Sequence, residues 1–343
     1  MDPGGGTRAG AQSTTAPAGT DGRGAGPGPG PRPRTPPPTP APTPAPTPTP
    51  TPTPTPIPTR RDDGMTQQAP AGSGDPAGPE GYPRGTAHRF TAADGTPLTY
   101  HVHGADTAAP GTPPVVLHHG FVADTFVNWV APGIVGELTA RGHRVVGIDA
   151  RGHGRSGKPH DPAAYGESVM ARDLRGLLDL LGAERVHLAG YSMGAVVSLL
   201  AAAGDERVTR LVVGGVGAGV VEVGGLDTRA LPTGSVIAAL TAEDPATVAA
   251  EAAGFRALAD AVGADRAALA AHAAAIHRAP MPLTEVTAST LVIAGDEDPL
   301  AVRPAVLADA IPGARLHTVP GDHLTAVRDP GFVSAIAGFF AEG

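Results

Sequence analysis

The pentapeptide Gly-Tyr-Ser-Met-Gly at residues 190–194 constrains this chain more than any other feature of its sequence. It follows a short β-prone run at residues 185–189 and precedes residues 195–203, whose composition predicts a helix. A Gly-x-Ser-x-Gly motif between a strand and a helix predicts a tight turn that strains the backbone of its serine. We therefore expect the hydroxyl group of Ser192 to project out of a sheet.

The first 85 residues differ in composition from the rest of the chain. They contain 23 of the 39 prolines and few large apolar side chains, so they cannot bury enough surface to offset the entropy of ordering. We predict a disordered tail with polyproline II character. It is either a spacer, a ligand for proline-binding modules or, as we favour, a segment without function, and Met65 is a candidate natural start. The remaining residues, 86–343, are rich in Val, Leu and Ala and suffice for one folded domain.

Charge and composition exclude several classes of function. The chain has 25 basic and 33 acidic side chains, and residues 86–343 hold 18 of the basic and 27 of the acidic ones. These residues contain no basic stripe, so we expect no nucleic-acid partner. The chain has no cysteine, which excludes disulfides and thiolate catalysis. Residues 1–6 lack the apolar region of a secretory signal, and no apolar run is long enough to span a membrane. We predict a cytoplasmic protein that does not bind membranes.

Strands and helices alternate along the predicted domain. The predicted strands lie at residues 98–102 (an edge strand), 115–117, 144–149, 185–189, 208–213, 290–294 and 314–319, and the predicted helices at residues 128–141, 168–181, 195–203 and 332–340. This alternation predicts an α/β fold, with a mostly parallel sheet of about eight strands and helices on both faces. Residues 217–283 interrupt it with Ala-rich helices, which we interpret as a cap over the sheet; a peripheral helical hairpin is the alternative.

A serine hydroxyl becomes a nucleophile only beside a base, which a third group must orient. The base is predicted at His323, which follows the last strand in a glycine-containing turn. The acid is expected in the loop after the strand at residues 290–294. There we favour Asp298, because the turn begun at Gly295 would direct it toward the serine, and Asp296 is the second candidate.

An oxyanion requires two backbone donors near the serine. The amide of Met193, at the start of the predicted helix, is one candidate. The amide of Phe121, just after the strand at residues 115–117, is the other. The neighbouring His118 and His119 would point to opposite sides of a strand and lack a visible third ligand, so we expect neither a metal nor a cofactor.

Four motifs occur in one order along the chain: His-Gly-Phe at residues 119–121, Asp-Ala-Arg-Gly-His-Gly-Arg-Ser at residues 149–156, Gly-Tyr-Ser-Met-Gly at residues 190–194, and Gly-x-x-Asp at residues 295–298 followed by His323. Residues 86–343 thereby resemble the α/β-hydrolase fold superfamily. The resemblance implies a triad of Ser192, Asp298 and His323, with Phe121 and Met193 as oxyanion donors. Asp322, directly before the histidine, departs from the usual glycine and offers the imidazole an alternative contact.

The nucleophile narrows the reaction class. In this superfamily, haloalkane dehalogenases and epoxide hydrolases carry aspartate at the position of Ser192. We therefore predict a hydrolase that cleaves a carboxylic ester, lactone or related acyl bond in a small apolar substrate. The alternatives are a non-hydrolytic tailoring enzyme and a catalytically silent binding protein. Trp129, Phe126 and Phe255 are candidate pocket residues, and core packing is the alternative for Trp129 and Phe126.

Overall fold

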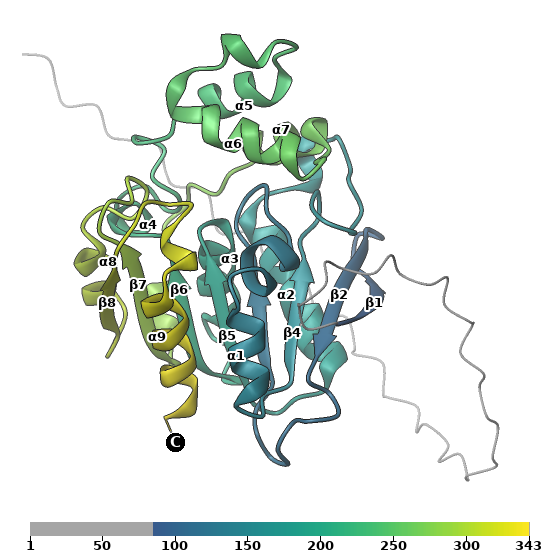
Figure 1. The fold of residues 1–343 in the computed structure, drawn as a ribbon, viewed down its shortest axis with the longest axis vertical. Coiled ribbons are helices and arrows are strands. Elements are labelled where there is room, and N and C mark those ends of the chain that lie inside the picture. The colour runs from purple at the N-terminus through teal and green to yellow at the C-terminus, as the bar shows by residue number, and fades with distance from the viewer. Residues whose placement is uncertain (1–84, 343) are drawn as a thin grey trace, which may run out of the picture. The chain divides into compact units, whose positions relative to one another are not determined.

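The computed structural model describes residues 85–342, which form an eight-stranded sheet with helices on both faces (Figure 1). The predicted tail lies outside the described residues, apart from Gly85. The strand order is β1-β2-β4-β3-β5-β6-β7-β8, and the strands are β1 Thr86–Thr91, β2 Pro97–His103, β3 Val115–His118, β4 Val145–Asp149, β5 Val186–Tyr191, β6 Val208–Gly214, β7 Ser289–Gly295 and β8 Arg315–Val319. The predicted mostly parallel sheet is confirmed, since the neighbours from β4 to β8 are all parallel.

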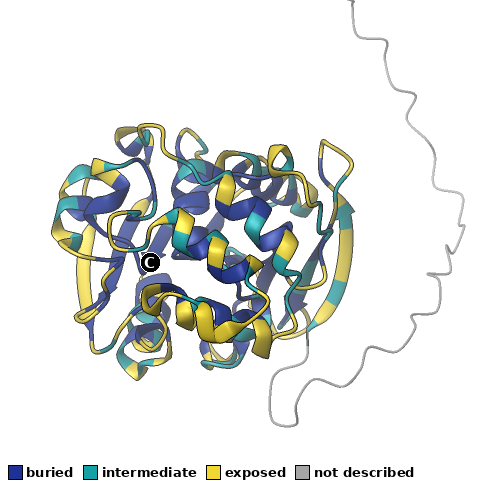
Figure 2. Ribbon diagram, turned by 90° about the horizontal axis from the view of Figure 1, so that it is seen from above, coloured by how far each residue is buried: buried dark blue, intermediate teal, exposed yellow. Residues whose placement is uncertain are grey.

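The edge of the sheet differs from the prediction. The strand expected at the edge, β2, lies second, because β1 pairs with it antiparallel and β4 pairs with its other side. β1 is mostly exposed, and its apolar and polar residues alternate only weakly. It therefore lacks the apolar pattern from which a strand is predicted. Figure 2 shows the buried residues concentrated in the sheet interior, whereas both edge strands, β1 and β8, are mostly exposed.

Alternate strand residues pack against opposite helical layers. The helices of these layers are α1 Ile134–Ala140, α2 Glu167–Leu181, α3 Met193–Ala202, α8 Pro304–Ala310 and α9 Pro330–Ala341, with short 3₁₀ turns at Pro162–Ala164, Leu283–Glu285 and Ala326–Arg328. In β3, Val116 joins the apolar cluster under α2, α3 and α8, whereas Val115 and Leu117 join the cluster under α1 and α9. Because both faces are covered, the strands from β3 to β7 are mostly buried, whereas the edge strand β8 is mostly exposed.

The helix predicted at residues 128–141 is two elements. A π-helical turn at Phe126–Val130 is followed by a short turn and then by α1. Gly133 sits between them with φ of 89°, a left-handed conformation that interrupts a right-handed helix. The apolar periodicity continues across the break, which is why the sequence pattern merged the two elements.

The inserted helices occupy the end of the sheet where β5 meets α3. They comprise α4 Ala218–Glu222, α5 Thr233–Thr241, α6 Ala250–Ala261 and α7 Arg266–Ala274, with a 3₁₀ turn at Pro245–Thr247. Figure 1 shows α5, α6 and α7 beyond the strand ends. They share an apolar cluster with Val122, which belongs to the loop after β3. Among the described residues, no helix has the length and apolarity needed to cross a membrane.

Candidate active site

Ser192 lies at the junction of β5 and α3. Its φ of 53° and ψ of −116° form a strained conformation for a residue with a side chain. The turn leaves no space at Gly194, where an added Cβ would collide with the carbonyl oxygen of His118. The glycine therefore permits the close approach of α3 to β3 on which the strained turn depends.

The imidazole of His323 bridges Ser192 and Asp298. Its Nδ1 lies 2.9 Å and 3.0 Å from the two carboxylate oxygens of Asp298, and its Nε2 lies 2.9 Å from Oγ of Ser192. A carboxylate only accepts hydrogen bonds, so Nδ1 carries the proton and Nε2 accepts from the serine hydroxyl. This arrangement leaves Nε2 ready to remove the hydroxyl proton.

The two candidate acids have different surroundings. Asp298 is 4% exposed, and its Oδ1 also accepts a hydrogen bond from the amide of Leu300 at 2.8 Å. Asp296 is exposed and accepts from the amide of Gly321 at 2.9 Å, which joins the acid loop to the base loop. The structure therefore brings Asp298, and not Asp296, to the imidazole.

Two contacts position the base loop. The hydroxyl of Tyr191, inside the pentapeptide, donates to the carbonyl of His323 at 2.8 Å. The carboxylate of Asp322 accepts from the amides of Leu324 and Thr325 at 3.0 Å and 2.9 Å. Asp322 therefore fixes its own turn through Oδ1, and Nδ1 of His323 contacts Asp298 rather than Asp322.

The loop after β3 approaches the serine closely. A Cβ added to Gly120 would lie 3.4 Å from Cβ of Ser192, and the Gly120 amide is held by Oδ1 of Asn128 at 2.8 Å. The next residue is Phe121, and Val122 then has φ of 69°, a strained conformation for a β-branched residue. Met193 is the first residue of α3, so its amide has no acceptor within that helix. The amides of Phe121 and Met193 therefore both belong to segments that border Ser192.

The segment at residues 149–156 holds the loop after β3 through hydrogen bonds. Oδ1 of Asp149 accepts from the amide of Thr125 at 3.1 Å, and Nε2 of His119 accepts from the amide of Ala150 at 2.9 Å. Nδ1 of His119 donates to the carbonyl of Gly120 at 2.8 Å. Both ring nitrogens of His119 are thus engaged with the backbone, which is a structural rather than a metal-binding arrangement.

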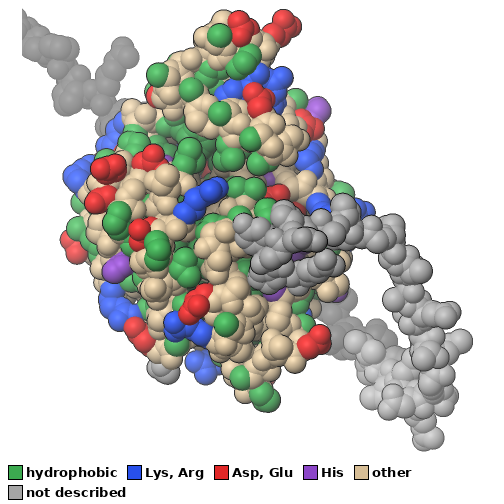
Figure 3. Space-filling model, in the orientation of Figure 1, with side chains coloured by type: hydrophobic (Ala, Val, Ile, Leu, Met, Phe, Trp, Pro, Cys, Tyr) green, Lys and Arg blue, Asp and Glu red, His purple; other side chains and the backbone are tan. Residues whose placement is uncertain are grey.

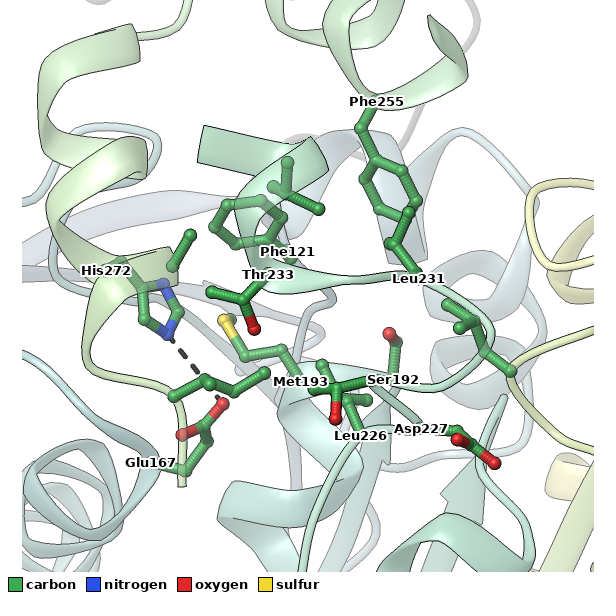
Figure 4. Close-up of a pocket in the computed structure, with 15 residues that line it drawn as sticks. Phe121, Glu167, Ser192, Met193, Leu226, Asp227, Leu231, Thr233, Phe255 and His272 are labelled. Carbon is green, nitrogen blue, oxygen red and sulfur yellow. Dashed lines mark ion pairs between the residues drawn. The ribbon is translucent and has the colours of Figure 1, made fainter. Parts of the chain in front are cut away.

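Two cavities meet at Ser192. The smaller, of about 50 Å³, is bordered by Phe121, Met193 and Phe255 together with apolar residues of the inserted segment (Figure 4). The larger cavity, of about 260 Å³, is bordered by His323 and Asn128, and it shares Phe255 with the smaller one. On the face drawn in Figure 3, apolar side chains gather below the inserted helices, and acidic and basic groups are interspersed elsewhere.

Of the three predicted pocket residues, only Phe255 lines these cavities. Trp129 is fully buried in the cluster under α1 and α9, and Phe126 packs against the same cluster. Their assignment to the pocket is therefore corrected to core packing. Both belong to the π-helical turn, whose apolar side faces the sheet.

Sequence reasoning missed the ionisable groups of the smaller cavity, Glu167, Asp227 and His272. Glu167 directly precedes the helix predicted at residues 168–181, and His272 lies within the predicted cap, residues 217–283. Both are almost fully buried, at 1% and 2% exposure. A charged residue at a helix start gives no sequence signal that a distant helix will cover it.

Comparisons with known proteins agree with this fold. A family model described as the alpha/beta hydrolase fold matches residues 113–216. Epoxide hydrolase B of Mycobacterium tuberculosis is 35% identical over 113 residues, covering 32% of this chain and 30% of that protein. The 2-hydroxy-6-oxononadienedioate/2-hydroxy-6-oxononatrienedioate hydrolase of Cupriavidus pinatubonensis is 36% identical over 137 residues, covering 39% and 46%. The chain spans less than half the length of these curated relatives.

Solved structures match over a longer range. A hydrolase from Pseudomonas aeruginosa PA01 has a TM-score of 0.60 and 28% identity, covering 75% of this chain and 99% of that one. The enol-lactonase from Burkholderia xenovorans LB400 has a TM-score of 0.56 and 25% identity, covering 74% and 100%. The family model over residues 113–216, the likeness to solved hydrolase structures and the sheet topology together show that the chain has the α/β-hydrolase fold.

Proposed function

We propose that the chain is a serine hydrolase that cleaves a carboxylic ester or lactone through an acyl-enzyme intermediate. One observation carries the proposal: Nε2 of His323 lies 2.9 Å from Oγ of Ser192 while Asp298 holds Nδ1. The likeness to an enol-lactonase supports an acyl substrate. The relatives named epoxide hydrolases act on a different bond, and a serine nucleophile fits an acyl carbon rather than an epoxide.

The proposed reaction begins with proton transfer from Ser192 to Nε2 of His323 as Oγ attacks the acyl carbon. Asp298 stabilises the imidazolium that forms and keeps the ring oriented. The imidazolium then protonates the departing alcohol, which leaves an ester on Ser192. Water, deprotonated by the same imidazole, adds to this ester and releases the acid, so the enzyme returns to its starting state.

The negative charge that develops on the carbonyl oxygen needs donors already in place. The amides of Phe121 and Met193 are the proposed donors, since their segments border Ser192. The positive end of the α3 dipole adds to the stabilisation at Met193. The strain at Val122 and Ser192 is consistent with a backbone held in place for this purpose.

The two cavities would receive different parts of the substrate. His323 borders only the larger of them, and the leaving alcohol must lie near its Nε2 to receive the proton. The larger cavity would therefore hold the alcohol portion. The acyl portion would lie in the smaller cavity beside Met193, where apolar walls favour a short chain.

Hydrolysis in the presence of methanol tests the acyl-enzyme directly. A set of esters with one acyl group and different alcohols would form the same intermediate, so the ratio of acid to methyl ester is expected to be constant across the set. The ratio is measured by chromatography of the products. A ratio that varies with the leaving alcohol, or no turnover of any ester, would contradict the proposal.

The variant Asp298→Asn is expected to lower kcat by about 10⁴-fold, because asparagine no longer favours the Nδ1 proton. Asp296→Asn, in the same loop but exposed, is the matched control and is expected to change kcat by about twofold or less. Steady-state kinetics on one ester compares them. Equal losses in the two variants would remove Asp298 from its proposed role.

A further inference from the structure

Two buried ionisable side chains, Glu167 and His272, border the smaller cavity, whose wall also includes Asp227, Thr228 and Thr233 among its apolar residues. Glu167 begins α2 and His272 lies on α7, so the sheet domain and the inserted helices each contribute one group. Figure 4 shows them facing each other on one side of the cavity, with Met193 between them and Ser192. Two polar groups that are almost fully buried cost free energy unless they are hydrogen-bonded.

The Glu167 carboxyl is incompletely engaged by the protein. Its Oε2 accepts a hydrogen bond from the amide of His277 at 2.6 Å. Burial raises its pKa to about 7, although the amides of His277 and of Glu167 itself oppose this shift. No cation pairs with it at hydrogen-bond distance among the described residues, and a carboxyl group can accept several bonds.

The His272 ring is held in place, and one of its nitrogens lacks a partner. The ring stacks on Tyr165 at 5.5 Å and meets Phe121 edge-on at 5.2 Å. Within the described part of the chain, its buried Nδ1 has no hydrogen-bond partner. Burial lowers the pKa of His272 to about 3, so near neutral pH the ring has one donor and one acceptor nitrogen.

The separation of the two groups suits a bridging oxygen. Nε2 of His272 lies 3.9 Å from Oε1 of Glu167, which is too long for a direct hydrogen bond. An oxygen atom placed between them would reach both at about 2.8 Å. A hydroxyl group can donate to one and accept from the other, whereas a methyl group would leave both unpaired.

We propose that Glu167 and His272 bind a hydroxyl group on the acyl portion of the substrate, so that the enzyme prefers hydroxyacyl esters to their alkyl counterparts. This inference rests on the proposed function of the site. A substrate carboxylate in the place of this hydroxyl group would face the carboxyl group of Glu167, with no cation beside them among the described residues to offset the repulsion. The other carboxyl on the cavity wall, Asp227, is already paired with Arg229 at 2.6 Å and 2.8 Å.

Paired substrates test the preference. Ethyl ω-hydroxyalkanoates of graded length are compared with the ethyl alkanoates in which a methyl group replaces the hydroxyl group. At the best chain length, kcat/KM is expected to favour the hydroxy ester by about tenfold to a hundredfold. Glu167→Leu is expected to abolish the preference, whereas Glu167→Gln, which can still hydrogen-bond, should retain most of it.

Two measurements keep this test separate from that of the proposed function. Thermal unfolding shows whether Glu167→Leu and Glu167→Gln are folded. Dissociation constants measured on Ser192→Ala report binding without turnover, so a preference for the hydroxy ester there supports the pocket even when no ester is hydrolysed. Equal kcat/KM and equal binding for both members of every pair, or a preference that survives Glu167→Leu, would overturn the inference.

Discussion

Ser192→Ala is expected to lower kcat/KM for ester hydrolysis by between about 10⁴-fold and 10⁶-fold. The variant loses the hydroxyl oxygen that lies 2.9 Å from Nε2 of His323, so no acyl-enzyme forms. The residual rate would come from the oxyanion donors and from binding alone. Steady-state kinetics on the preferred ethyl ester measures the loss.

The control for this variant is its stability. Ser192 contributes no cap hydrogen bond to α3, so removal of its hydroxyl group costs the bond to His323, about 1 kcal/mol, and should lower the thermal unfolding temperature by only a few degrees. An inactive variant that remains folded assigns the loss to chemistry. A folded Ser192→Ala protein with more than a tenth of the wild-type activity would contradict the proposed mechanism.

The domain is expected to lose stability steeply as the pH falls from 6.5 toward 4. Burial lowers the pKa of His118 and of His272 to about 3 and places that of His153 well below its usual value. The rings of His118, His119, His153 and His272 form a chain, with successive centroids 5.1 Å to 5.6 Å apart. Protonation of one therefore disfavours protonation of the next.

The sign of this change in stability follows from the number of protons that the folded and the unfolded chain bind. Below pH 6.5 the histidines of the unfolded chain bind protons, whereas the buried histidines of the folded protein stay neutral. Each buried histidine therefore contributes stability that is present above pH 6.5 and is lost as the pH falls toward 3. At pH 4 the loss is about 3 kcal/mol each for His118 and His272. Glu167 acts oppositely, since its raised pKa of about 7 favours folding as the pH falls through that value. The imidazoles outnumber it, so the net change is a loss.

Urea unfolding at several pH values tests this expectation. The free energy of unfolding should fall by several kcal/mol between pH 7 and pH 4 in the wild type. His118→Asn keeps a donor for the carbonyl of His119 but cannot be protonated in this range, so its curve should be flatter by about 3 kcal/mol. Parallel curves for the two proteins would contradict the assigned cause.

Much of the fold was predictable because its signals are local. Buried parallel strands such as β3 and β7 are short apolar runs, and they are separated by helices with a clear apolar face. The topology of such a sheet brings the carboxyl ends of its strands to one edge. Ser192, Asp298 and His323 follow three of these strands, so their meeting could be inferred without coordinates.

The remaining features depend on packing between distant segments. β1 is held mainly by backbone pairing with β2, which leaves little trace in its side chains. The direction of Trp129 depends on a π-helical turn that apolar periodicity does not reveal. Glu167 and His272 meet only because the inserted helices cover the start of α2, an orientation that no local pattern determines.

The site of covalent modification tests the central claim most directly. The full chain is treated with a fluorophosphonate, digested, and the peptides are examined by mass spectrometry. We expect one phosphonate on Ser192, no labelling of Ser192→Ala, and much slower labelling of Asp298→Asn. A phosphonate carried by another residue, or undiminished labelling of Ser192→Ala, would show that the hydroxyl beside His323 is not the nucleophile.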